Sequence, residues 1–175
     1  EEQEHEAHTF QEYGGGEHSS GESLDDFESW EKEMAEAALT VMNNAAEVGC
    51  KIILPSDVVV AEQLKLGSTG ETVHISAVPP NMMILDIGTN TAQAIATELE
   101  SCRTLLWNGP LGAFEYPPFD GGTRVVSRAA AELTTQSKLH SIAGGGDTIA
   151  ALVSANTLSR FSYVSTVGGA FLEWL

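Results

Sequence analysis

The chain has 175 residues, of which 42% are hydrophobic and 19% are charged, and this composition excludes a wholly disordered protein. A chain of this length is expected to form one domain around a buried core. Its 25 acidic and 8 basic residues give a formal net charge of −17. Because a surface this negative repels phosphodiester backbones and anionic lipid headgroups, and no basic run offsets it, we expect neither nucleic acid nor a membrane as a partner.

Acidic residues are concentrated near the N-terminus. Residues 1–36 contain 13 acids and one base, Lys32. Residues 1–23 also mix Gly, Ser, His and Glu with few large apolar side chains, so we interpret them as an acidic, poorly ordered or degraded segment. No run is apolar for long enough to span a bilayer, and the acidic start is unlike a signal peptide, so a cytoplasmic location is expected. The first residue is Glu rather than Met, which suggests a fragment.

The first element expected along the chain is an amphipathic helix at 31–47, where apolar residues recur at the i, i+3, i+4 spacing and Gly49 is placed to end the helix. Beyond it, short β-branched runs alternate with helical stretches, which predicts an α/β fold with a largely parallel sheet. Ligands of such sheets bind beyond the carboxyl ends of the strands. The expected strands are 51–54, 57–61, 73–75, 83–87, 104–107, 139–143 and 162–165, and the later helices are 91–99, 123–133 and 148–153.

Glycine turns follow three of these strands, at 108–110, 144–148 and 167–169. Glycine allows backbone N–H groups to approach a phosphate closely, and the N-terminus of a following helix adds partial positive charge. Two such turns in one crevice would bind an anion without basic side chains. An acidic protein can therefore still bind a nucleotide phosphate through backbone amides and a metal.

Two acidic residues near these turns each have two interpretations from the residues alone. Asp147 opens the helix after the 144–148 turn, where a carboxylate either caps the helix or reaches a Mg²⁺ ion on a nucleotide. Glu115 lies in a Pro- and Gly-rich stretch, where it either accepts hydrogen bonds from a ribose or is simply solvated.

Several segments, taken together and in order, are more specific than any one glycine turn. They are Lys-Ile-Ile-Leu-Pro-Ser-Asp-Val-Val-Val-Ala at 51–61, Leu-Asp-Ile-Gly at 85–88, Trp-Asn-Gly-Pro-Leu-Gly-Ala-Phe-Glu at 107–115, Gly-Gly-Gly-Asp-Thr at 144–148 and Ser-Thr-Val-Gly-Gly-Ala-Phe-Leu-Glu at 165–173. In these segments the chain closely resembles the C-terminal, nucleotide-binding half of phosphoglycerate kinase.

The resemblance covers residues 24–175 and implies a partial nucleotide-binding domain with a doubly wound, Rossmann-like sheet flanked by helices. The family is glycolytic and transfers a phosphoryl group between 1,3-bisphosphoglycerate and Mg²⁺·ADP, giving 3-phosphoglycerate and ATP. Phosphoglycerate binds to an N-terminal domain that this chain does not contain. We therefore expect ADP or ATP with Mg²⁺ as the ligand, and a monomer.

The resemblance also implies roles for individual residues. Asp147 would position the nucleotide-bound Mg²⁺, with Thr148 beside the phosphates. The phosphates and the transferring group would meet the backbone of Gly145, Gly146, Gly168 and Gly169. The nucleoside site would be lined by Asn108, Pro110, Ala113 and Glu115, with Glu115 on the ribose, and the adenine would be flanked by Leu24, Leu64, Ile84 and Leu85. With the family context, the metal interpretation of Asp147 leads.

Departures from the family pattern predict that the chain alone is inactive. Val167 replaces a glycine of the family's Thr-Gly-Gly-Gly-Ala turn, and its β-branched side chain resists positive φ. Gly88-Thr89 stands where the family has Gly-Pro. The family's lysine-bearing glycine segment is absent, as is the phosphoglycerate domain with its arginine. The alternative function is a stand-alone, non-catalytic nucleotide-binding or interaction module.

Overall fold

The computed structural model describes the backbone of residues 24–165 and the side chains of residue 30 and residues 32–165. The acidic segment at 1–23 and the positions of Val167, Gly168 and Gly169 lie outside the described residues. Contacts divide the chain into two units, residues 1–52 and 53–175, and each is described by itself.

A single helix, α1 (Leu24–Glu47), occupies most of the described part of the first unit. It contains the predicted helix at 31–47 and begins earlier than expected. Gly49 has a φ of +72°, and beyond it the Cys50 N–H donates to the Ala45 carbonyl at 2.8 Å. The predicted glycine cap is confirmed, because glycine adopts this left-handed conformation at no steric cost.

The second unit begins with an antiparallel sheet, and this part of the fold differs from the expected parallel arrangement. The sheet contains β1 (Asp57–Ala61), β2 (Glu71–His74) and β3 (Met83–Ile87) in the order β2-β1-β3, with a short helix η1 (Ile75–Ala77) before β3. The connection between β1 and β2 is too short for the crossover that a parallel pair requires. The ladder between β1 and β3 shifts register between Val59 and Val60.

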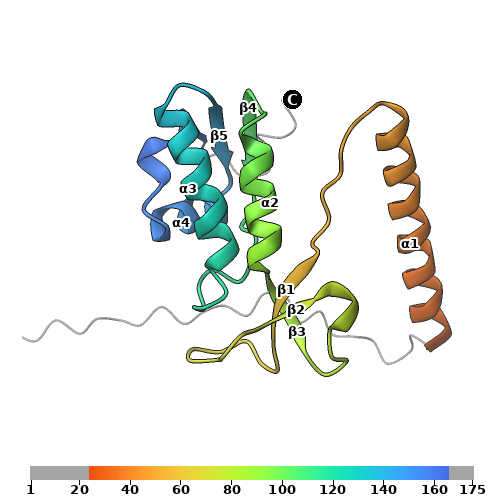
Figure 1. The fold of residues 1–175 in the computed structure, drawn as a ribbon. Coiled ribbons are helices and arrows are strands. Elements are labelled where there is room, and N and C mark those ends of the chain that lie inside the picture. The colour runs from red at the N-terminus through yellow and green to blue at the C-terminus, as the bar shows by residue number, and fades with distance from the viewer. Residues whose placement is uncertain (1–23, 166–175) are drawn as a thin grey trace, which may run out of the picture. The chain divides into compact units, whose positions relative to one another are not determined.

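A parallel sheet follows, as predicted. It contains β4 (Thr104–Asn108), β5 (His140–Gly144) and β6 (Tyr163–Ser165) in the order β4-β5-β6. The crossovers contain α3 (Gly121–Thr135), then α4 (Gly146–Ser154) with a short helix η2 (Leu158–Arg160), and α2 (Thr89–Leu99) leads from β3 into β4 (Figure 1). This helix–strand alternation gives the second unit the expected mixed α/β architecture.

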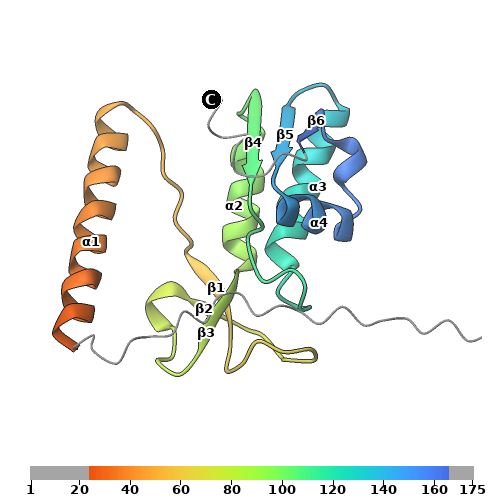
Figure 2. The same cartoon turned by 180° about the vertical axis from the view of Figure 1, so that it is seen from behind.

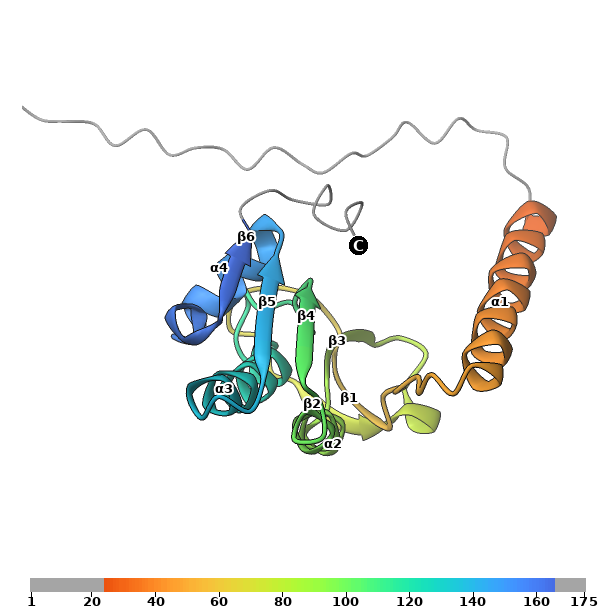
Figure 3. The ribbon, with the colours of Figure 1, turned by 90° about the horizontal axis from the view of Figure 1, so that it is seen from above.

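Helices α2 and α3 lie side by side on one face of the parallel sheet (Figure 3). Figure 2 looks onto the sheet from the opposite side, with β4 and β5 in front of these helices. The core between sheet and helices includes Trp107, Val126, Leu139, Leu152 and Phe161. The rings of Trp107 and Phe161 meet edge to face with centroids 6.1 Å apart.

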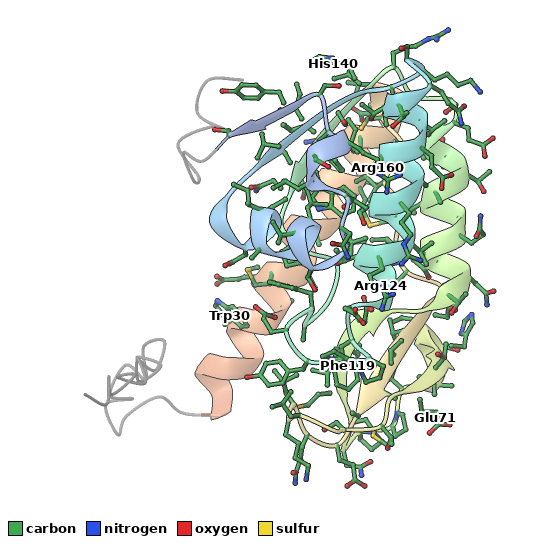
Figure 4. All side chains as sticks on the ribbon, turned by 90° about the vertical axis from the view of Figure 1, so that its left-hand side faces the viewer. Trp30, Glu71, Phe119, Arg124, His140 and Arg160 are labelled. Atoms are coloured by element: carbon green, nitrogen blue, oxygen red, sulfur yellow. The ribbon has the colours of Figure 1, made fainter. Side chains whose placement is uncertain are left out.

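A second apolar cluster belongs to the antiparallel sheet. Phe119 is fully buried there with Ala61 and Leu85, and Figure 4 shows it beside these strands, below Arg124 in the first turn of α3. Phe119 thus anchors the segment between β4 and α3 against the antiparallel sheet.

One predicted strand is not formed. Residues 51–54 belong to no helix or strand, and the Ile52, Ile53 and Leu54 side chains are exposed. A strand needs a hydrogen-bonded neighbour, and no strand within residues 24–165 pairs with this run.

Candidate nucleotide site

A cavity of about 360 Å³ lies between β3 and the segment that follows β4. Ile84 and Leu85 line it from β3, and Pro110 and Ala113 line it from the segment. The Ala113 N–H donates to the Leu85 carbonyl at 2.8 Å, which fixes the segment to the strand. Four residues expected around a nucleoside, from sequence positions far apart, are thereby brought to one cavity.

The turn at 108–110 connects this cavity to the N-terminus of α4. The Gly109 N–H donates to Thr148 Oγ1 at 2.7 Å, and the next residue, Pro110, lines the cavity. Thr148 is buried. Gly109 also accepts a hydrogen bond at its carbonyl, from Trp107 Nε1 at 2.6 Å. The turn is therefore held at both its amide and its carbonyl, which preorganises the passage from cavity to helix.

Gly145 ends the tight turn between β5 and α4 and requires glycine. Its φ is +95°, a conformation that side chains of other residues rarely allow. A Cβ here would lie 3.5 Å from both Asn108 Oδ1 and Thr148 Oγ1. The geometry therefore brings the predicted residues Asn108, Gly145 and Thr148 together at the carboxyl ends of β4 and β5.

Gly146 and Asp147 are exposed at the first turn of α4. The N-cap residue of α4 is Gly145, which has no side chain to cap the helix, and Asp147 is the acidic residue of the first turn. The first amides of a helix lack partners within the helix, and they attract anions. Among the residues that the structure describes, no group of three or more His, Cys, Asp or Glu could hold a metal ion. A Mg²⁺ ion at this turn would therefore have one nearby carboxylate, that of Asp147, and would need phosphates and water for its other ligands.

Other predicted residues lie apart from this cavity or outside the description. Glu115 is exposed in the segment after β4 and does not line the cavity. Leu64 is 40% exposed in the connection between β1 and β2, and does not line it either. Leu24 begins α1 in the first unit, and its side chain is not described. Gly168 and Gly169 lie outside the described residues.

Asp86 is a residue of this site that the sequence analysis did not assign. It is 3% exposed at the end of β3 and lines the cavity. Burial raises the pKa of Asp86 to about 6, against the opposing effect of hydrogen bonds from backbone N–H groups. The signal available in the sequence was an acid inside the apolar run Met-Ile-Leu-Asp-Ile, because a carboxylate in a buried strand needs a specific partner.

The fold is that of an α/β protein in which a glycine turn at Gly145 leads from the carboxyl end of a parallel strand into a helix, the place where such folds bind ligands. Comparison with known proteins gives the particular family. The family model described as phosphoglycerate kinase matches residues 7–175, so the chain belongs to the phosphoglycerate kinase family.

Individual relatives agree with this assignment. The phosphoglycerate kinase of Rhizobium leguminosarum bv. trifolii is 52% identical over 145 residues, and that of Cereibacter sphaeroides is 50% identical over 145 residues. Each alignment covers 83% of this chain and 36% of the relative. The chain therefore spans about a third of the length of these relatives.

Solved structures show the same relationship. The phosphoglycerate kinase of Coxiella burnetii matches with a TM-score of 0.75 at 42% identity, covering 81% of this chain and 36% of that one. The enzyme of Pyrococcus horikoshii matches with a TM-score of 0.58 at 26% identity, covering 82% of this chain and 35% of that one. Within the described residues, no helix combines the length and apolar character needed to cross a membrane.

Proposed function

We propose that this chain is the nucleotide-binding part of a phosphoglycerate kinase and binds Mg²⁺·ADP or Mg²⁺·ATP. The observation that carries the proposal is the continuity from the apolar cavity at Ile84 and Pro110, through Gly109, to the N-terminus of α4. An apolar cavity suits a planar base, and helix amides beside a glycine turn suit phosphates. The cavity and the helix N-terminus are neighbours, as the base and the phosphates are at the two ends of a nucleotide.

The expected residue roles follow this arrangement. Gly145, Gly146 and Thr148 lie beside the phosphates, Asn108 lines the nucleoside site with Pro110 and Ala113, and Asp147 contributes a ligand to the Mg²⁺ ion. Because phosphoryl transfer requires little covalent chemistry from the protein, positioning and charge stabilisation are what these groups supply. Glu115 remains the proposed contact to the ribose, and Gly168 and Gly169 the proposed contacts to the transferring group.

The complete reaction is proposed only for a full-length kinase. The chain spans about a third of the length of the relatives described above, and the family resemblance assigns phosphoglycerate binding and the cations at the transferring phosphoryl group to segments outside it. We therefore expect no phosphoglycerate-dependent ATP turnover from the purified 175-residue chain in a coupled assay. Ordinary turnover in that assay would contradict this expectation.

Isothermal titration calorimetry with Mg²⁺·ADP tests the binding proposal. Asp147→Asn should weaken binding roughly tenfold because the metal loses a charged ligand, and the weakening should disappear when ADP is titrated without Mg²⁺. Glu132→Gln is the matched control, because it removes one exposed negative charge from α3 away from the cavity. Equal effects of the two substitutions would indicate a general charge effect and contradict the assigned role of Asp147.

The second candidate, a stand-alone non-catalytic module, is not favoured. The family match extends over residues 7–175, and the relatives described above are all phosphoglycerate kinases.

A further inference from the structure

Two buried carboxylates cap helices from strands that are remote in sequence. Asp57 on β1 accepts hydrogen bonds from the N–H groups of Asn90 (3.0 Å) and Thr91 (2.7 Å) in the first turn of α2. Asp86 on β3 accepts from the N–H of Gly122 (2.8 Å) in the first turn of α3. Neither helix has a capping hydrogen bond from the side chain of its own N-cap residue. The two strands therefore supply the caps that the helices lack.

Of these two carboxylates, only Asp86 also packs against residues 109–122, the segment that follows β4 and lines part of the cavity. A Cβ added at Gly112 would overlap the Asp86 carboxylate and lie 2.6 Å from the carbonyl oxygen of Phe119. A Cβ at Gly122 would lie 2.6 Å from Asp86 Oδ1. The carboxylate thus fills a space that glycines on both sides leave open, and the backbone at both ends of the segment packs directly on it.

Further hydrogen bonds hold the same segment close to Asp86. The Leu111 N–H donates to Thr123 Oγ1 at 3.0 Å, which connects the start of the segment to α3. The Ala113 N–H donates to the carbonyl of Leu85, the residue before Asp86. Displacement of the carboxylate would therefore move Gly112 and α3 together, and Gly112 lies between two residues that line the cavity.

We propose that Asp86 is a positioning residue for the nucleotide site: its buried carboxylate fixes the 109–122 segment against β3 and so sets the shape of the nucleoside cavity. The proposal rests on the proposed nucleotide binding and adds to it a residue that the ligand need not touch. Two acceptor oxygens are required, because Oδ1 accepts from the Ile87 N–H and Oδ2 from the Gly122 N–H, both at 2.8 Å. An amide offers only one acceptor.

The charged surroundings support a positioning role over a stabilising one. Asp120, the N-cap residue of α3, is the neighbouring charge, and it raises the pKa of Asp86 further. Arg124 of α3 pairs with Asp120 at 3.3 Å. No ion pair of Asp86 occurs among the described residues, and with a pKa of about 6 the carboxylate is ionised at neutral pH at a cost to folding. What the Asp86 carboxylate contributes is therefore the placement of residues 109–122 rather than a gain in folding stability.

Hydrogen–deuterium exchange of the whole chain, combined with Mg²⁺·ADP titration, tests the proposal. Asp86→Asn should make exchange in residues 109–122 roughly tenfold faster, as expected when an amide loses a charged acceptor, and should weaken Mg²⁺·ADP binding. Asp86→Ala, which leaves no acceptor, should have the larger effect on both. Asp57→Asn is the matched control: it removes the equivalent cap from α2, so it should speed exchange in residues 89–99 and leave 109–122 unchanged.

The outcomes separate this proposal from the proposed function. Faster exchange confined to 109–122, with weaker Mg²⁺·ADP binding, supports both. If the native chain binds no Mg²⁺·ADP but the variants show the same exchange pattern, the proposed function is overturned, whereas the anchoring of residues 109–122 by Asp86 is still supported. Unchanged exchange, or an increase spread equally into α2, overturns the positioning role. If the Asp86 variants do not fold, Gly112→Ala keeps the carboxylate and crowds it, and it must produce the same local increase in exchange.

Discussion

Gly145 shows how one backbone angle fixes the phosphate end of the site. Its φ of +95° points the chain from β5 into α4 so that Thr148 reaches the Gly109 amide. Gly145→Ala should destabilise the fold by about 1–3 kcal/mol, because the new side chain is strained at this angle. Gly146→Ala is the control, since its Cβ meets nothing within 4 Å and it lies within a helix. Urea unfolding of the two variants measures the difference, and equal stability of both would contradict this explanation.

The pH dependence of stability should report on Asp86. Because burial raises its pKa from 3.8 to about 6, the folded state binds its proton more tightly than the unfolded state does. The contribution of Asp86 to the free energy of unfolding is therefore greatest below pH 4 and decreases as the pH rises toward 6, by up to about 3 kcal/mol.

Asp57 should show the opposite sign. Burial alone would raise its pKa, but hydrogen bonds from the Thr91 hydroxyl and from the N–H groups of Asn90 and Thr91 outweigh burial and hold the pKa below its usual value. Its stabilising contribution is present above pH 4 and is lost as the pH falls.

Urea unfolding at several pH values between 4 and 7 tests the raised pKa of Asp86. The free energy of unfolding should decrease less steeply with rising pH for Asp86→Asn than for the native chain, because the variant lacks the titrating carboxylate. Parallel curves would contradict the assigned pKa of Asp86.

The helices and strands of the second unit were largely predictable from the sequence. The β-branched runs located β1 and β3 at their observed bounds, and α2, α3 and α4 each begin two residues before the predicted start. The early starts have a physical cause at α2 and α3, where the first turns are capped by Asp57 and Asp86 from other strands. A local pattern contains no information on a cap that is remote in sequence.

Strand direction and pairing were not predictable in the same way. The alternation of strands and helices predicted a largely parallel sheet, which is confirmed for β4, β5 and β6, whereas β1, β2 and β3 form an antiparallel sheet. The run at 51–54 has strand composition and still forms no strand. Composition reports how apolar a strand is, whereas pairing depends on which neighbour is available.

For the molecule as a whole, family motifs predicted more of the candidate site than residue patterns did. Pro110, Ala113, Ile84 and Leu85 share one cavity, although nothing in their local sequence distinguishes them from ordinary core or loop residues. Asp86 was missed because its importance arises from contacts with glycines that come together only in the folded chain.

The central claim is that a nucleotide occupies the path from this cavity to the N-terminus of α4. Titration of the ¹⁵N-labelled chain with Mg²⁺·ADP, followed by two-dimensional amide NMR, tests it most directly. We predict amide shifts concentrated at residues 84–85, 109, 111–113 and 145–149, with α2 unaffected. Saturable binding whose shifts lie elsewhere, or no shifts at millimolar Mg²⁺·ADP, would contradict the assignment of this path as the nucleotide site.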